Sequence, residues 1–150
     1  GGDHACARMG GRIRCWGRND HGQLGNDEAV AGSPTVDVLD IDDAVQITAG
    51  ALHTCALRSD RSLWCWGSNE WGQLGSGAPM QRCAGDNFPC SGTPLAVDGG
   101  KAFIQLAASI RHTPVRSRQG TAYTVLPSAE NTASAAFDVD TATRSAPTRA

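Results

Sequence analysis

The chain has 150 residues, of which 40% are hydrophobic and 19% are charged, and its formal net charge is −2. This is the composition of an ordinary globular protein, and its scattered arginines lack the clustering that a nucleic-acid-binding face needs. No apolar run approaches the roughly 18 residues that a membrane-spanning helix requires.

The first half of the chain contains the same block twice. Residues 15–25 read CWGRNDHGQLG and residues 65–75 read CWGSNEWGQLG, and the differences fall at polar or loop-like positions. Residues 4–7 (HACA) likewise match residues 53–56 (HTCA). A period of about 50 residues indicates a repeat architecture.

Each repeat unit predicts short β-strands. Segments such as 44–48, 53–57 and 62–66 are short, rich in branched and aromatic residues and separated by Gly, Ser and Asp. This pattern is typical of strands joined by turns. Four such strands fit into one unit.

The repeated block resembles the regulator of chromosome condensation repeat family, whose units read approximately G-x-x-H-T-x-A-L and then W-G-x-N-x-x-G-Q-L-G. The resemblance covers residues 1–75 well, 102–113 weakly and the remainder poorly. It implies an all-β fold, a partial β-propeller of about two to three four-stranded blades, and a fragment of a larger ring, because propellers close with about 4–8 blades. It gives a structural role to the repeat residues His4, Trp16, Gly22, Gln23, Leu24, Gly25, His53, Trp66, Gly72, Gln73, Leu74 and Gly75, with the two tryptophans packed between blades.

The cysteines suggest a register for the first hairpin. If Cys6 faces Cys15 across an antiparallel pair, then Met9 faces Arg12 and residues 10–11 are left as the turn. These two residues are Gly-Gly, which suits a two-residue type I′ or II′ turn.

The second hairpin follows the same rule with one extra residue. Pairing Cys55 with Cys65 places Leu57 opposite Leu63 and leaves residues 59–61 in the turn. Directly opposed Cα atoms lie about 4.5–5.5 Å apart, which a disulfide accepts.

Three explanations compete for these cysteines. A zinc site would take its ligands from His4, Cys6, Cys15 and His21, but the second unit has Trp71 at the position of His21. Buried reduced thiols are another alternative. We favour the disulfides Cys6–Cys15, Cys55–Cys65 and Cys83–Cys90, with no metal and no cofactor. Stable disulfides place the protein in an extracellular, periplasmic or cell-surface location.

After the second block, the sequence no longer follows the repeat pattern closely. Residues 81–90 form a polar excursion closed by its own cysteine pair, which serves to staple a loop and could also be a binding element. Residues 104–113 track residues 45–54, but Pro114 then stands where the next cysteine is expected. We therefore expect propeller units near 1–50, 51–100 and 101–113, followed by a degenerate or disordered tail over 114–150 without a regular hairpin.

The sequence favours a protein-binding module without enzymatic activity. It contains neither a nucleophile elbow nor a phosphate-binding loop, and the acidic residues at 40–43 read as a solvated turn. Variable positions inside a repeated block are candidates for contact with a protein partner, and they are Asn19, Asp20, His21, Asn69, Glu70 and Trp71. The alternatives are an accessory propeller domain attached to a secreted hydrolase, or a secreted enzyme inhibitor.

Overall fold

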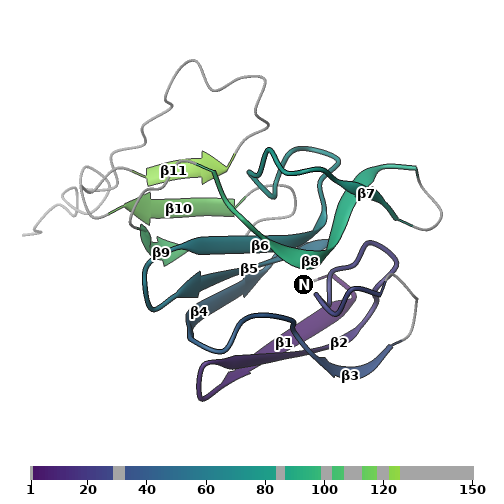
Figure 1. Cartoon of the computed structure of the whole chain (residues 1–150), viewed down its shortest axis with the longest axis horizontal. Helices are drawn as coiled ribbons and strands as arrows, with labels where there is room; N and C mark the ends of the chain where they lie inside the picture. Colours follow the sequence, from purple (N-terminus) through teal and green to yellow (C-terminus); the bar gives the residue numbers. More distant parts are fainter. Residues whose placement is uncertain are drawn as a thin grey trace, which may run out of the picture.

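The structure is a computed structural model that describes residues 2–28, 33–83, 87–98, 103–106, 113–117 and 122–125. All regular elements in these ranges are strands, so the all-β prediction is confirmed. They form three antiparallel sheets (Figure 1). The first has the order β1-β2-β3, with β1 at His4–Met9, β2 at Arg12–Gly17 and β3 at Ser33–Asp37.

The second sheet has the order β4-β5-β6-β8-β7. Its strands are β4 (Ala44–Ala49), β5 (His53–Arg58), β6 (Leu63–Ser68), β7 (Gln81–Arg82) and β8 (Pro89–Ala96). Four of them make the expected unit, and the two-residue β7 is added at the outer edge by the excursion that precedes β8.

The predicted registers of the first two hairpins are confirmed. Cys6 pairs with Cys15 and Met9 with Arg12, and both glycines of the intervening turn have positive φ, +56° and +90°, as a type I′ turn requires. In the second hairpin, Cys55 pairs with Cys65.

The third sheet corrects the prediction that no hairpin follows residue 113. Its order is β11-β10-β9, with β9 at Phe103–Leu106, β10 at Thr113–Ser117 and β11 at Ala122–Val125. Thr113 pairs with Val125, just as Thr54 pairs with Trp66 in the second unit. Backbone pairing therefore persists without the cysteines and the tryptophan, because a strand ladder is made by main-chain groups. The predicted tail beyond residue 125 lies outside the described residues.

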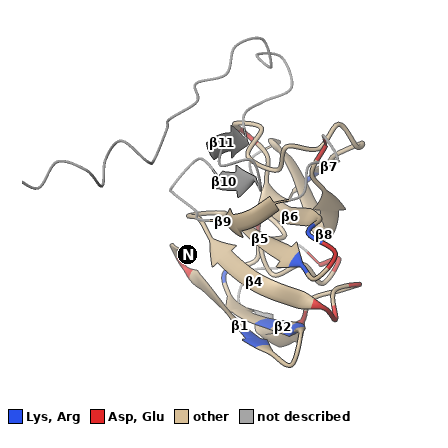
Figure 2. Ribbon diagram, turned by 90° about the vertical axis from the view of Figure 1, so that its left-hand side faces the viewer, with Lys and Arg blue, Asp and Glu red and all other residues tan. Residues whose placement is uncertain are grey.

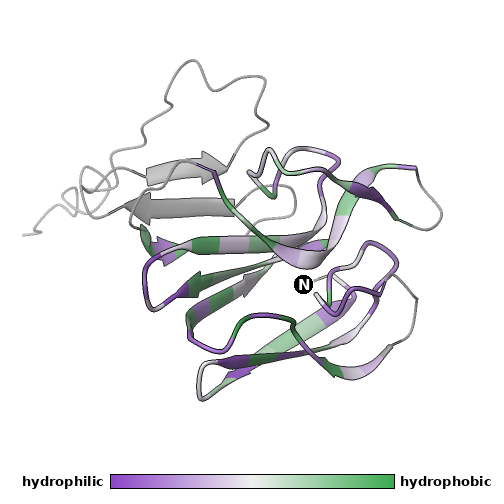
Figure 3. Cartoon of the chain, in the orientation of Figure 1, coloured by the Kyte–Doolittle hydropathy of each residue, from purple (hydrophilic) through white to green (hydrophobic). Residues whose placement is uncertain are grey.

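Two apolar clusters lie where neighbouring units meet. One joins the first and second units through residues that include Ile13, Leu24 and Trp66. The other joins the second unit to β9 and includes Leu74, Phe103 and Leu106. Figure 3 shows hydrophobic segments alternating with hydrophilic ones along the strands, and Figure 2 shows basic and acidic segments interspersed.

Candidate functional site

The two repeated loops, 19–25 and 69–75, have the same internal hydrogen bonds. In the first, the side-chain oxygen of Asn19 accepts the N–H of Leu24 at 2.9 Å, and the side-chain oxygen of Gln23 accepts the N–H of His21 at 2.8 Å. Gly22 has a φ of +73°, which favours glycine. The repeat residues thus hold the loop by satisfying its own backbone donors.

The second loop repeats this arrangement at each position. Asn69 accepts the N–H of Leu74 at 3.0 Å, and Gln73 accepts the N–H of Trp71 at 2.8 Å. Identical scaffolds therefore present different residues: His21 in one loop and Trp71 in the other.

Burial divides the predicted binding residues. Asn19 is fully buried and His21 is 5% exposed, so their assignment to a binding surface is corrected. The cause is the packing of the first loop against the second unit, where the N–H of Asp27 donates to the carbonyl of Gly92 at 2.9 Å. Glu70 is exposed, as its loop position leads one to expect, and Trp71 is 46% exposed.

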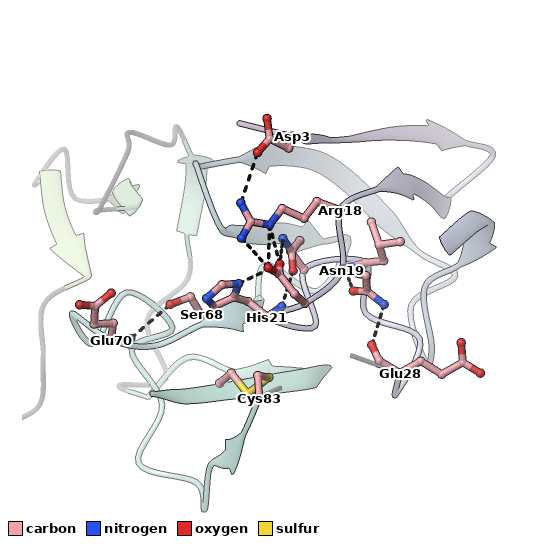
Figure 4. Close-up of polar contacts among 12 residues, drawn as sticks. Asp3, Arg18, Asn19, His21, Glu28, Ser68, Glu70 and Cys83 are labelled. Carbon is pink, nitrogen blue, oxygen red and sulfur yellow. Dashed lines mark hydrogen bonds and ion pairs between the residues drawn. A yellow bond between two sulfur atoms is a disulfide. The ribbon is translucent and has the colours of Figure 1, made fainter. Parts of the chain in front are cut away.

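Asp20 belongs to a polar cluster that holds the first loop (Figure 4). Its carboxylate accepts hydrogen bonds from the guanidinium of Arg18 and lies 2.9 Å from Nδ1 of His21. Arg18 also reaches Asp3 at 3.4 Å. Partial burial opposes ionisation of Asp20, but these hydrogen bonds hold its pKa well below its usual value. The carboxylate is therefore used in hydrogen bonds that hold the first loop.

The carbonyl of Gln23 is the junction between the first two units. It accepts the indole N–H of Trp66 at 3.0 Å and the hydroxyl of Thr54 at 3.0 Å. Trp66 is fully buried between the units, whereas Trp16, its repeat equivalent, is 42% exposed. Among the described residues, Trp16 is not buried against a second unit, so its packing between blades stays a prediction.

The repeat histidine of the first unit completes this junction. Nε2 of His4 lies 2.9 Å from the hydroxyl oxygen of Thr54. Since that hydroxyl donates to Gln23, its oxygen accepts from His4, which assigns the neutral tautomer protonated at Nε2. Burial lowers the pKa of His4 to about 4, and the residue acts as a structural bridge.

Each predicted cysteine pair forms a disulfide in the structure. Cys6–Cys15 and Cys55–Cys65 have Cα separations of 4.1 Å, and Cys83–Cys90 has one of 5.9 Å. The first two lie inside sheets. The third closes the β7–β8 excursion.

The β7–β8 excursion is tied to the second repeated loop. The N–H of Asn69 donates to the carbonyl of Pro89 at 2.8 Å, and the guanidinium of Arg82 donates to the carbonyl of Asn87 at 2.6 Å. Phe88, next to this tie, is 44% exposed. Phe88 was not predicted as a binding residue, although its position between the two cysteines of a disulfide-closed loop could have indicated it.

The acidic segment 40–43 is more than a solvated turn. Asp43 forms an ion pair with Arg58 and accepts the hydroxyl of Ser59 at 2.8 Å. The hydrogen bond from Arg58 lowers the pKa of Asp43. Arg58 in turn lies 5.5 Å from the ring centre of Trp64.

Two negative findings apply to the ranges that the structure describes. They contain no group of three or more His, Cys, Asp or Glu side chains placed to hold a metal ion. They also contain no helix of the length and apolar character needed to cross a membrane.

Comparison with known proteins points to one family. The family model described as "Regulator of chromosome condensation (RCC1) repeat" matches residues 10–57 and 60–115, and a second model with that description matches 44–73. The regulator of chromosome condensation of Mus musculus is 32% identical over 130 residues, which cover 83% of this chain and 29% of the mouse protein.

Solved structures show the same fold. Yeast RCC1 (Prp20), solved with Kap60 bound, has a TM-score of 0.71 at 21% identity and is matched over 81% of this chain and 30% of its own. A second structure, from Saccharomyces cerevisiae, is described with the binding of Prp20p to Gsp1p and histones and has the same TM-score. Human WBSCR16 has a TM-score of 0.65 at 21% identity, over 81% of this chain and 31% of its own. The chain thus spans about 30% of the length of these relatives, and its fold is a partial β-propeller.

Proposed function

The chain belongs to the regulator of chromosome condensation (RCC1) repeat family, and we propose that it is part of a non-catalytic propeller that binds another protein outside the cytosol. The relatives support the class of partner, since the yeast Prp20 structures are described with the proteins Kap60, Gsp1p and histones. Those partners belong to the yeast protein and are not assigned to this chain. For this chain, the proposal is a protein partner bound through its loops, without nucleic acid.

The choice of the binding surface rests on two exposed aromatic side chains. Trp71 and Phe88 are 46% and 44% exposed, and they belong to two segments joined by the hydrogen bond between Asn69 and Pro89. Large aromatic side chains are enriched among the residues that dominate interface energies. We therefore place the binding surface at Trp71 and Phe88, with Glu70 beside them.

The scaffold below this surface favours binding because it limits the entropy lost on association. The Trp71 loop is held by Asn69 and Gln73, and the Phe88 segment is closed by the Cys83–Cys90 disulfide. Both aromatics are thus presented on backbone that is already ordered.

The three disulfides support the proposed location. Disulfides persist in secreted, periplasmic and surface proteins and are rare in the cytosol and nucleus. All cysteines of the chain are paired. A nuclear location would place these bonds in a reducing compartment.

A two-step experiment tests the function. A photo-crosslinking amino acid at position 71 or 88 should capture one protein from extracellular and surface material, while the same group at Val45, which is 50% exposed, should not. The captured protein is then purified for affinity measurements. Trp71→Ala should weaken its binding by about 2 kcal/mol, roughly 30-fold.

Trp16→Ala is the matched control, since Trp16 is a similarly exposed tryptophan on another part of the chain. It should leave the affinity unchanged. The proposed surface is wrong if the two substitutions weaken binding equally, or if Trp71→Ala lowers stability while the affinity is unchanged.

A further inference from the structure

The two repeated loops differ in how they use one carboxylate. In the first loop, the carboxylate of Asp20 accepts hydrogen bonds from Nε of Arg18 at 2.8 and 2.7 Å. It also lies 2.9 Å from Nδ1 of His21 and accepts a hydrogen bond from Nε2 of Gln23 at 3.3 Å. The first loop therefore supplies its own guanidinium to its own carboxylate.

The second loop has the same internal hydrogen bonds but lacks this cation. Glu70 and Ser68 take the positions of Asp20 and Arg18. The hydroxyl of Ser68 accepts the N–H of Glu70 at 3.4 Å, and the carboxylate of Glu70 has neither a hydrogen bond nor an ion pair with the residues that the structure describes. Figure 4 shows this carboxylate pointing away from Ser68 and His21. Glu70 is exposed, so its charge faces the solvent.

The cations near this part of the chain have other partners. Arg82, in the β7–β8 excursion that is tied to the second loop, donates to the backbone and side-chain oxygens of Asn87 at 2.6 and 3.0 Å. Arg18 is paired with Asp20. Among the described residues, none supplies a cation to Glu70.

The residue after the carboxylate also differs between the loops. His21 is 5% exposed, whereas Trp71 is 46% exposed. The face of an exposed indole attracts a cation, and a guanidinium stacks on it because it is planar and weakly hydrated. Glu70 and Trp71 therefore offer a carboxylate and an aromatic face on adjacent residues of an ordered loop.

We propose that this loop recognises an arginine side chain of the protein partner, with its guanidinium paired to Glu70 and stacked on Trp71. The inference rests on the proposed function, because it specifies what the partner presents to the same surface. The ion pair between Arg18 and Asp20 is its model within the chain. Arginine is favoured over lysine because a guanidinium can pair with a carboxylate through two N–H groups while its plane lies on the ring.

The probe for this site is N-acetyl-arginine methylamide, which carries the guanidinium without a partner protein. Its titration into the isotope-labelled 150-residue chain should give saturable NMR shifts at the amide of Glu70 and at the indole N–H of Trp71. N-acetyl-citrulline methylamide has nearly the same shape without the charge, and it should give no saturable shift. N-acetyl-lysine methylamide should bind more weakly than the arginine probe.

Two substitutions separate the charge from the ring. Glu70→Gln keeps a hydrogen-bond acceptor and removes the charge, whereas Trp71→Leu keeps an apolar side chain and removes the aromatic face. Each should weaken binding of the arginine probe about fivefold. Asp40→Asn is the matched control, because Asp40 is an exposed carboxylate without an adjacent aromatic residue. It should leave the affinity for the probe unchanged.

The small probes distinguish failure of this inference from failure of the proposed function. The arginine site is refuted if the arginine probe does not bind, if the citrulline or lysine probe binds equally well, or if Glu70→Gln or Trp71→Leu leaves the affinity unchanged. The proposed function fails separately, whatever the probes do, if Trp71→Ala leaves the affinity for the captured protein unchanged.

Discussion

Trp66 donates its indole N–H to the carbonyl oxygen of Gln23, 3.0 Å away, and this bond crosses from the second repeat unit to the first. The ring is fully buried and covers Gly25 so closely that a Cβ there would lie 2.8 Å from the indole nitrogen. Trp66 therefore stabilises the junction between the two units by packing and by a directed hydrogen bond.

Substitution of Trp66 should separate these two contributions. Trp66→Phe keeps much of the apolar surface but leaves a buried carbonyl with one fewer donor, at a cost of about 1–2 kcal/mol. Trp66→Ala also opens a cavity and should cost about 3–5 kcal/mol. Urea unfolding measures both free energies. Trp16→Ala, at a half-exposed site, should cost less than about 1 kcal/mol; an equal loss there would mean that Trp66 has no special role.

Two glycines with positive φ make a matched test of the same junction. Gly25 has a φ of +71° and faces the Trp66 ring, whereas Gly10 has a φ of +56° and no atom within 4 Å of the place a Cβ would take. Gly10→Ala should cost only the left-handed backbone conformation, about 1 kcal/mol. Gly25→Ala should cost roughly 2 kcal/mol more because the ring must move. Thermal and urea unfolding of both variants decide this, and equal losses would contradict it.

The disulfides should differ in their effect on global stability. Loss of Cys55–Cys65 through a double Ser substitution should lower the free energy of unfolding by about 2–3 kcal/mol, from a loop with a sequence separation of 10. Loss of Cys83–Cys90 should cost less, because its excursion can open locally while the sheets stay folded. Non-reducing peptide mapping of natively produced protein checks the pairs. Free thiols at all six positions would refute both the pairing and the proposed location.

His4 should make the fold sensitive to mild acid. Its pKa falls from 6.5 to about 4 on burial, so protonation favours the unfolded state. The stability that neutral His4 contributes is complete above pH 6.5 and is lost as the pH falls from 6.5 to 4, by up to about 3 kcal/mol. Urea unfolding at about pH 7.5, 6 and 5 measures the loss.

His4→Gln is the control for this pH dependence, since it keeps a side-chain donor for Thr54 and removes the titration. Its stability should change little between about pH 7.5 and 5. If the substituted and native chains lose stability in parallel over this range, another group is responsible.

The amino-acid sequence alone determined the repeat, the all-β class and the register of two hairpins. These are local properties: Cys6 and Cys15 are joined by one short turn, so a pairing of the cysteines leaves a single alignment of the strands. The hydrogen bonds of the repeated Asn and Gln side chains are local too, since each accepts a backbone N–H within its own loop, but this role of the Asn residues was found in the structure and not predicted.

Only the tertiary structure decided which repeated positions are exposed. Asn19 and Asn69 occupy the same place in equivalent loops, yet the first is fully buried and the second is partly exposed. β8, from the following unit, packs on the first loop at Gly22 and Asp27 through Gly92. The exposure of Trp16 and the contact of Gln46 with Leu106 likewise depend on which unit lies next to which. A sequence repeat specifies the unit, whereas burial depends on the neighbours that the unit meets in space.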